Sequence, residues 1–269
     1  MPPIEFDADS DLHVALWDEL PLWSALAGEL LLEHAPLDAR RVLDLGCGTG
    51  FPTLELAERL GPEARVVGLD PWAPAIARAG AKRENWSVAN ADLVRGDGAR
   101  LPFRNGAFDL AISSLGVNNF EDPGAAFAEC RRVLGAGGAL VLASNLVGHF
   151  HQLYDAFTAV LARRGDTAAL EKLRAHVEHR ATLEGLERAL ATHGFRVERT
   201  HTREAMVRFA NGAAVMSHHF MRLGFVPAWR EVGGESALDA LRVELDDRAR
   251  VAGELRLTVP LAVLIARVV

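Results

Sequence analysis

Three closely spaced glycines directly after a short apolar stretch constrain the fold of this chain most. The apolar stretch is Arg41–Leu45, and the glycines follow at every second position, as Gly46, Gly48 and Gly50. Glycine lets the backbone turn sharply and approach a ligand closely, because it has no Cβ. A helix expected from Pro52 onward would add free backbone N–H groups at the end of the turn. The pattern predicts a buried strand, a ligand-binding turn and a helix in succession.

The spacing of these glycines separates two kinds of nucleotide site. A dinucleotide fingerprint has glycine at the first, third and sixth positions of the turn. Counted from Gly46, the sixth position is Phe51, and the third glycine is Gly50 instead. The turn therefore departs from the dinucleotide pattern, although it can close around a nucleoside and the chain attached to it.

Short apolar runs alternate with stretches of helical length between Arg41 and Asn145. The runs that predict buried strands are Arg41–Leu45, Arg65–Leu69, Phe108–Ser113 and Gly138–Ala143. The stretches that predict helices are Thr53–Leu60, Pro74–Lys82 and Ala125–Leu134. Strands that alternate with helices indicate βαβ units, and hence a parallel sheet covered on both faces.

The second half of the chain interrupts this rhythm twice. Leu146–Arg180 has apolar residues at helical spacing, broken into two helices near Arg163, and Glu204–Arg250 is again helical in pattern. Between these segments Thr182 predicts the N-cap of a helix, and Gly194 predicts its end. Two further strands are predicted, at Phe195–His201 and Leu255–Arg267.

Composition excludes several classes of protein. The chain has 269 residues, 49% of them hydrophobic, and a formal net charge of −7. Because its charges are interleaved and no basic face is evident, a nucleic-acid partner is not expected. The two cysteines, Cys47 and Cys130, lie outside any CxxC pattern, and the histidine pairs lack further ligands at metal spacing, so no metal site is expected. Without a signal-like start or a run of about 20 apolar residues, a cytoplasmic protein with no membrane span is expected.

Two acidic residues stand where a ligand at the glycine turn would need them. Asp70 ends the predicted second strand, about 20 residues beyond the glycines, where an acid can accept both ribose hydroxyls. Pro71 and Trp72 follow and can pack against a base. Asp97 lies in the sequence Gly96-Asp97-Gly98-Ala99, ahead of Leu-Pro-Phe. Taken alone, Asp70 is also compatible with an ordinary Asp-Pro turn, Asp97 with a surface turn, and Trp72 with packing in the core.

Together these residues resemble the class I methyltransferases that use S-adenosylmethionine. That family has D/E-x-G-x-G-x-G at its first motif, here Asp44 with Gly46, Cys47, Gly48 and Gly50. The resemblance implies that the turn wraps the methionyl and ribose parts of S-adenosylmethionine and that Asp44 anchors the amino-acid end. It further implies that Asp70 binds the ribose.

Two later motifs extend the resemblance. In the family, GDA-x-x-LPF holds an acid that binds the adenine amino group, a role that falls here on Asp97, with Gly98 and Ala99 supplying backbone contacts. The family's E-x-x-R-V-L-K-P-G-G corresponds to Glu129–Gly138, with Gly-Ala in place of Lys-Pro in a turn. In pattern the chain looks most like the methyltransferases of ubiquinone and menaquinone biosynthesis, which act on small molecules.

The resemblance implies a Rossmann-like three-layer α/β/α sandwich. Its sheet would have seven mostly parallel strands, with the last strand antiparallel, and the two interrupting segments would be helical lids. The expected organisation is an N-terminal helical lid segment at 1–36, a cofactor-binding core at 37–145, a helical lid at 146–181, a core helix and strand at 182–203, a second helical lid at 204–254 and a last core strand at 255–269.

The expected reaction is methyl transfer from S-adenosylmethionine to a small apolar or aromatic acceptor. Since ligands bind beyond the carboxyl ends of the strands in such sheets, candidate residues follow the predicted strands Phe108–Ser113 and Gly138–Ala143. They are Ser114 for the cofactor and Asn118, His149 and His151 for catalysis, although methyl transfer often needs only positioning. Protein methylation and a non-catalytic S-adenosylmethionine-binding role remain the alternatives.

Overall fold

The computed structural model describes residues 7, 9–18 and 21–269, which form two compact units. The sheet unit contains the described residues up to Asn145, together with Ala181–Arg203 and Leu261–Val269. The helical unit contains Leu146–Arg180 and Glu204–Pro260, and Asp7 is assigned to it. Parts of the expected N-terminal lid, residues 1–6, 8 and 19–20, lie outside the described residues.

The described residues build one seven-stranded sheet in the order β3-β2-β1-β4-β5-β7-β6. Its strands are β1 Arg41–Leu45, β2 Arg65–Asp70, β3 Ala91–Arg95, β4 Leu110–Ser114, β5 Ala139–Asn145, β6 Phe195–Phe209 and β7 Leu255–Val268. Strands β1 to β5 pair in parallel, whereas β7 is antiparallel to β5. The predicted Rossmann-like architecture is confirmed, including the antiparallel last strand.

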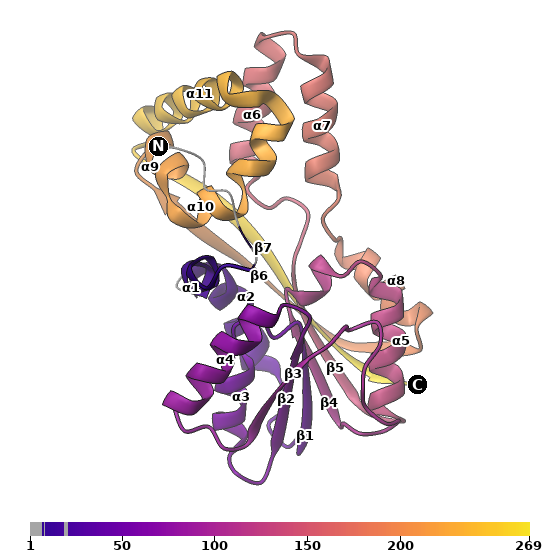
Figure 1. Ribbon diagram of the computed structural model, residues 1–269. Helices are drawn as coiled ribbons and strands as arrows, with labels where there is room; N and C mark the ends of the chain where they lie inside the picture. The colour runs from indigo at the N-terminus through magenta and orange to yellow at the C-terminus, as the bar shows by residue number, and fades with distance from the viewer. Residues whose placement is uncertain (1–6, 8, 19–20) are drawn as a thin grey trace. The chain divides into compact units, whose positions relative to one another are not determined.

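Helices cover both faces of this sheet. In Figure 1, α3 and α4 lie on one side of the strands, and α5 and α8 lie on the other. The helices of the sheet unit are α1 Asp11–Asp18, α2 Pro21–His34, α3 Thr53–Leu60, α4 Ala73–Asn85, the 3-10 turn η1 Gly116–Asn119, α5 Pro123–Leu134 and α8 Leu183–Thr192. Strand β5 lies between β4 and β7 and is buried along its whole length.

Local sequence signals place several helix ends where they were expected. Thr182 caps α8, since its hydroxyl accepts a hydrogen bond from the Gly185 N–H at 3.0 Å. Gly194, with φ of +78°, ends that helix in the left-handed region that favours glycine. The break between the two predicted helices after Leu146 is likewise found, with Asp166 as the N-cap of the second.

The short edge strand β3 was not located by an apolar run. Only its first residue, Ala91, is buried, and the other four are partly or fully exposed. An edge strand with a half-exposed surface does not need the continuous apolar stretch that marks a central strand. The strand forms because Val66–Asp70 of β2 pairs with it residue by residue, from Ala91 to Arg95.

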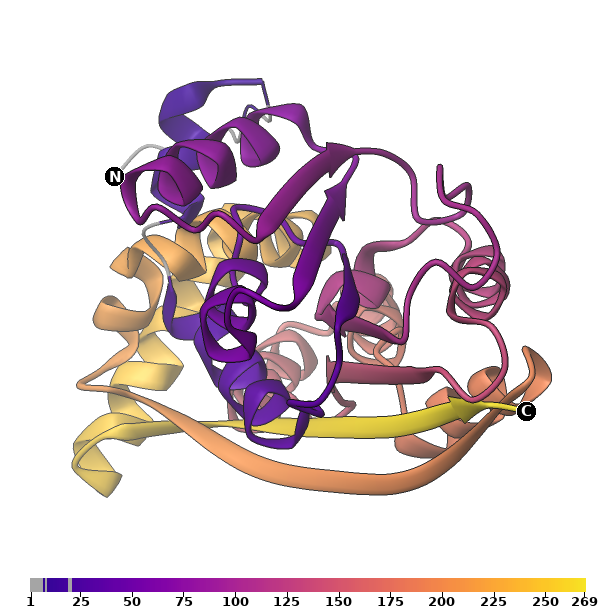
Figure 2. The same ribbon diagram turned by 90° about the horizontal axis from the view of Figure 1, so that it is seen from below.

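Strand β6 is longer than predicted, and this corrects the start of the second helical segment. Residues 204–209 continue the strand, because exposed and half-buried positions alternate from His201 to Arg208 with the period of two typical of a strand. In Figure 2, β6 and β7 run side by side as two long ribbons. The helical part of the segment begins only at Gly212.

The helical unit is built from five helices among the described residues. They are α6 His151–Arg163, α7 Thr167–Glu178, α9 Gly212–Ser217, α10 His219–Gly224 and α11 Val226–Ala252. Helix α11 packs against the other four and is kinked at Gly234, whose φ is +72°. Its Trp229 is fully buried, as are Phe150 and Phe157. Aromatic side chains thus form much of this unit's own core.

No helix in the described part of the chain combines the length and the apolar character that crossing a bilayer requires.

Candidate cofactor site at the carboxyl ends of the strands

The glycine turn lies at the end of β1, against the end of β2. The N–H groups of Gly46 and Cys47 both donate to the carbonyl oxygen of Leu69, at 2.8 and 3.2 Å. Three positive φ angles shape the turn, +75° at Gly46, +51° at Gly48 and +101° at Gly50. Side chains other than glycine rarely adopt such angles, so the backbone needs glycine at these positions.

The glycines at the start of the turn serve two different purposes. A Cβ on Gly46 would lie 2.9 Å from the Cα of Gly116, so this position allows two backbones to pack closely. A Cβ on Gly48 would meet no protein atom within 4 Å. Gly46 is therefore required by the fold, whereas Gly48 leaves the backbone accessible to a ligand.

Asp44 is fully buried beneath this turn with one carboxylate oxygen unused. The hydroxyl of Thr53 donates to its Oδ2 at 2.5 Å, while its Oδ1 has no hydrogen-bond partner among the described residues. Burial raises the pKa of Asp44 to about 7, partly offset by the Thr53 hydrogen bond, and the nearby Asp70 raises it further. A buried acceptor without a partner is costly, which makes Oδ1 a ready acceptor for a cationic ligand group.

Asp70 holds the next stretch of backbone. Its two carboxylate oxygens accept hydrogen bonds from the N–H groups of Gly48, at 2.9 Å, and Trp72, at 2.8 Å. Burial raises its pKa, and these two hydrogen bonds work in the opposite direction. Trp72 is half-buried at the start of α4, whereas Pro71 is exposed. Asp70 therefore stands beside the accessible Gly48, as a ribose ligand would.

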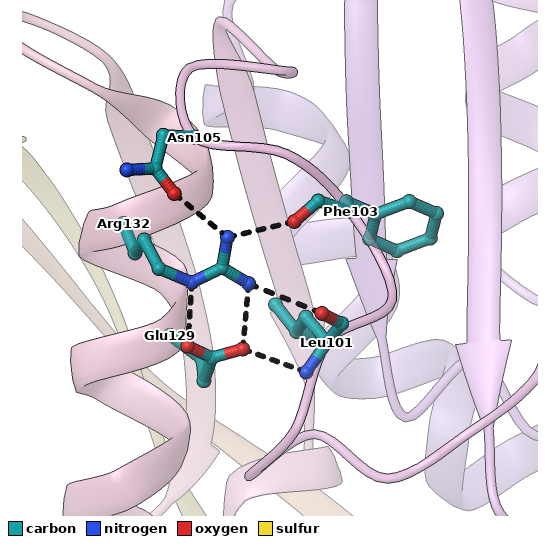
Figure 3. Close-up of polar contacts among 5 residues, drawn as sticks. All are labelled: Leu101, Phe103, Asn105, Glu129 and Arg132. Atoms are coloured by element: carbon teal, nitrogen blue, oxygen red, sulfur yellow. Dashed lines mark hydrogen bonds and ion pairs between the residues drawn. The ribbon is translucent and has the colours of Figure 1, made fainter.

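Asp97 lies in the loop that follows β3. A group of hydrogen bonds centred on Arg132, called here the hub, holds this loop against α5. The carboxylate of Asp97 accepts from the Ala99 N–H at 2.9 Å, which closes a tight turn. Figure 3 shows the hub, in which the guanidinium of Arg132 contacts Leu101, Phe103 and Asn105 of the loop. Arg132 donates to the carbonyl oxygens of Phe103 at 2.7 Å and Leu101 at 3.1 Å, and to Asn105 Oδ1 at 3.0 Å.

Glu129 completes this hub. It pairs with Arg132 through both of its oxygens at 2.7 Å, and it also accepts from the Leu101 N–H at 2.7 Å. The Arg132 guanidinium holds the pKa of Glu129 below its usual range. Glu129 and Arg132 belong to the family motif at Glu129–Gly138, but the motif gave neither residue a role. Their i, i+3 spacing on α5 was the only signal in the sequence that they form a pair.

Replacing Arg132 with methionine is expected to destabilise the sheet unit by about 1–3 kcal/mol, since several charge-assisted hydrogen bonds are lost. The neighbouring Arg131, which donates to the Val269 carbonyl oxygen at 3.3 Å, provides the matched control. Arg131→Met should change the free energy of unfolding by less than about 0.5 kcal/mol. Denaturant unfolding measures both, and equal losses would contradict the role given to Arg132.

Neutral polar groups gather at the carboxyl ends of β4 and β5. Asn118 donates to Asn145 Oδ1 at 2.6 Å and accepts from the Ser144 hydroxyl at 2.7 Å. The buried Ser114 hydroxyl has no hydrogen-bond partner among the described residues. Before η1, Leu115 adopts a left-handed conformation with φ of +60°, unusual for a residue with a branched side chain. Strained backbone and unsatisfied polar groups together are typical of a functional edge.

The two histidines proposed for catalysis lie in the helical unit. His149 is 1% exposed and its ring stacks on Phe150, with 3.7 Å between the ring centroids. Burial, with the charge of Arg180, lowers the pKa of His149 to about 2, so it is a weak base. His151 is exposed, with Nδ1 3.7 Å from the carboxylate of Asp155. A catalytic role for either histidine stays a prediction.

The two cysteines have packing roles. Cys47 fills the space next to Gly68. A Cβ added to Gly68 would lie 2.9 Å from the Sγ of Cys47. Both thiols are buried and free, and burial raises the pKa of each, that of Cys130 to about 12. Neither is a reactive thiolate at neutral pH.

Among the described residues no group of three or more His, Cys, Asp or Glu side chains is arranged to hold a metal ion.

One contact to the turn was missed by sequence reasoning. Asp18, at the end of α1, pairs with Arg78 at 2.8 Å and Lys82 at 2.6 Å on α4 and hydrogen-bonds to Thr49 in the turn. These partners lower its pKa although burial opposes them. No local pattern distinguishes Asp18 from the other acids in the sequence, because its partners are about 60 residues away.

Sheet order and site geometry together define a Rossmann-like fold of the methyltransferase class. Residues 43–142 match the family described as a methyltransferase domain. The match covers less than half of the chain and supports a class I methyltransferase domain in this part of it.

Individual relatives agree with this assignment. The chain is 38% identical over 151 residues to a demethylmenaquinone methyltransferase of Deinococcus radiodurans, a match that covers 53% of this chain and 59% of the relative. The chain thus spans less than two thirds of that relative's length. The motif-based resemblance to menaquinone-type methyltransferases is confirmed at this level.

Solved structures share the fold over most of the chain. A [4+2]-cyclase, SpnF, has a TM-score of 0.56 at 21% identity, covering 98% of this chain and 86% of the cyclase. A SAM-dependent methyltransferase from Methanosarcina mazei has a TM-score of 0.54 at 18% identity, covering 89% of this chain and 97% of its own. At such identities the likeness concerns the fold alone.

Proposed function

We propose that this chain binds S-adenosylmethionine and transfers its methyl group to a small apolar or aromatic acceptor. The observation that carries the proposal is the unpartnered, buried Oδ1 of Asp44 beneath a glycine turn with an accessible backbone at Gly48. An ammonium group of the amino-acid end would satisfy this oxygen, and Asp70 would accept the ribose hydroxyls. Asp97 would receive the adenine amino group.

The residues fit this cofactor by charge as well as by position. Asp44, Asp70 and Asp97 follow β1, β2 and β3 in turn or lie at their ends, so three acceptors line neighbouring strand ends of the sheet. S-adenosylmethionine supplies an electrophilic methyl group on a sulfonium centre. The chain's part would be to hold and orient both reactants, which can account for several kcal/mol of the barrier.

The acceptor would be positioned by neutral groups of the sheet unit. Ser114, Asn118 and Asn145 at the ends of β4 and β5 offer hydroxyl and amide groups but no titratable side chain. Such groups can hold a hydroxyl or amine without taking its proton. This arrangement supports an acceptor that is already nucleophilic near neutral pH, such as a hydroxyl group with a low pKa or an electron-rich ring carbon. His149 and His151 remain the candidates if proton transfer is required, and Asn118 would then orient the acceptor through its amide group.

Transfer of a labelled methyl group into a cell extract tests the proposal directly. The purified chain, labelled S-adenosylmethionine and extract are incubated, and the label is separated into small-molecule, protein and nucleic-acid fractions. We expect label in the small-molecule fraction. Label in protein would favour the protein methyltransferase alternative, and binding without any transfer would favour a non-catalytic role.

Calorimetry with S-adenosylmethionine, S-adenosylhomocysteine and NAD tests the cofactor separately. The two S-adenosyl ligands should bind and NAD should not, because glycine occupies position 50 and phenylalanine position 51. NAD binding without binding of either S-adenosyl ligand would overturn the assignment.

The affinity for S-adenosylhomocysteine is expected to decrease as the pH falls below 7. The pKa of Asp44 in the free protein is about 7, and pairing with an ammonium group requires the ionised form. Below this pKa the proton must be released on binding, so the affinity should fall by up to about tenfold per pH unit. Asp44 should contribute no pH dependence well above pH 7.

Calorimetry between pH 5 and 8 measures this dependence. The variant Asp44→Asn should bind S-adenosylhomocysteine weakly, with an affinity that does not change over this pH range.

The Asp44 carboxyl should also affect the stability of the fold. Its folded pKa lies above the unfolded value of 3.8, so the folded state binds more protons between about pH 4 and 7. Its contribution to stability therefore declines as the pH rises through that range. A parent protein whose affinity is constant from pH 5 to 8 would contradict the role of Asp44.

A further inference from the structure

A second group of polar side chains is buried inside the helical unit. The hydroxyl of Tyr154, on α6, lies 3.1 Å from His176 Nε2, on α7, and accepts a hydrogen bond from Trp229 Nε1, on α11, at 3.4 Å. Arg180, just after α7, donates to the carbonyl oxygen of His176 at 3.3 Å and hydrogen-bonds to Tyr154. Tyr154, His176 and Arg180 are called here the Arg180 cluster.

The cluster lies in an aromatic environment. Tyr154 is 4% exposed and Trp229 is fully buried, while His176 and Arg180 are partly exposed. The ring of Trp229 meets that of Tyr154 edge-on, with 6.4 Å between the centroids. One side of the cluster is thus dry, and the other is reached from solvent through Arg180. Electrostatic interactions are strengthened in such a partly desolvated site.

The charge of the cluster is not balanced. No carboxylate of the described residues lies within ion-pair distance of Arg180, whereas Arg163, Arg230 and Arg248 in the same unit each pair with a glutamate. Burial first, then the charges of Arg180 and His179, lower the pKa of His176 to about 4. Among the described residues no acidic group offsets these effects on His176, so its surroundings are electropositive.

We propose that the Arg180 cluster binds the oxyanion of a small organic molecule, a carboxylate or a phosphate. The guanidinium of Arg180 supplies charge and a planar pair of donors, which suits both anions. The Tyr154 hydroxyl accepts from Trp229, which leaves its own proton for His176 Nε2 or, once His176 is protonated, for the anion. His176 gains a favourable partner for its protonated form when the anion is present. The site belongs to the helical unit alone and does not depend on the proposed methyl transfer.

Binding of benzoate and phenyl phosphate to the full chain tests this proposal, with benzyl alcohol as the neutral probe. Ligand-observed NMR and calorimetry are carried out without any S-adenosyl ligand. We expect at least one of the two anions to bind and benzyl alcohol not to bind. The anion that binds more tightly identifies the carboxylate or the phosphate as the preferred group. Binding should raise the pKa of the His176 ring, followed by NMR of labelled histidine and assigned with His176→Gln.

Arg180→Gln should lower the affinity for the anion by about tenfold or more, since the charged donor is lost. Arg164 gives a matched control, because it is an exposed arginine of the same unit that bonds to Ser236 and no carboxylate. Arg164→Gln should bind the anion like the parent, and thermal melts check that both variants fold. Arg180→Lys, which keeps the charge, should retain part of the affinity.

Three results would overturn the proposal. They are equal binding of benzyl alcohol and the anions, unchanged affinity in Arg180→Gln, and an absence of binding by both anions. None of these results bears on the calorimetry with S-adenosyl ligands, so a failure of this site and a failure of the proposed methyl transfer can be told apart.

Discussion

Replacing Asp70 with alanine is expected to weaken binding of S-adenosylhomocysteine by about 3 kcal/mol, or roughly a hundredfold in Kd. The variant would lose a charged acceptor for two ribose hydroxyls. It would also release the N–H groups of Gly48 and Trp72, which the carboxylate now holds at 2.9 and 2.8 Å. Asp97→Ala should cost less, because a single contact to the adenine would be lost.

Asp92 offers a control for the loss of a carboxylate from a neighbouring strand. It lies on β3 and forms an ion pair with Arg65 whose side chains are 57% and 38% exposed. Such exposed pairs contribute little, so Asp92→Ala should bind the cofactor like the parent. Calorimetry gives all three affinities. If Asp70→Ala and Asp97→Ala both bind like the parent protein, the cofactor site has been placed wrongly.

Two alanine substitutions within the glycine turn should separate folding from binding. In Gly46→Ala, the left-handed φ costs about 1–2 kcal/mol, and the contact at 2.9 Å with the backbone of Gly116 adds about 1–3 kcal/mol. We therefore expect a loss of roughly 2–5 kcal/mol in the free energy of unfolding. That is a large part of the stability of an ordinary domain.

Gly48→Ala should behave differently, although it lies only two residues away. Its φ is also positive, at +51°, but an added Cβ would meet no protein atom within 4 Å. The expected loss of stability is about 1–2 kcal/mol, while the methyl group would block the approach of a ligand to the backbone. Affinity for S-adenosylhomocysteine should thus fall by much more than stability explains.

Denaturant unfolding and calorimetry on the two variants distinguish these effects. The signals must be assigned to the sheet unit, because a chain of two units need not unfold in a single step. Equal losses of stability in Gly46→Ala and Gly48→Ala would contradict the steric argument. Unimpaired ligand binding by Gly48→Ala would contradict the placement of the cofactor against the turn.

The sequence predicted the sheet unit well, because its signals are local. The turn at Gly46–Gly50 needs positive φ angles, and the central strands need continuous apolar runs, so both leave patterns within a few residues. Strand β3 was not located, since an edge strand can be half polar. Strand β6 was cut short because its alternation after His201 was assigned to a helical segment.

The candidate site was predicted in part. The acids at Asp44, Asp70 and Asp97 follow from motifs, whereas their actual partners do not. Thr53 beneath Asp44, and the hub of Arg132 on loop 97–105, depend on contacts between segments that meet only in the folded sheet.

What the sequence by itself determined is the central strands with the helices between them, the glycine turn and the acids around it. Backbone preferences and short-range periodicity specify these features within about ten residues. Only the tertiary structure decided which oxygen of Asp44 lacks a partner, that burial makes His149 a weak base, and that Tyr154, His176 and Arg180 share one site. The reason is physical: burial and hydrogen-bond partnership are properties of segments packed together, and no single segment encodes them.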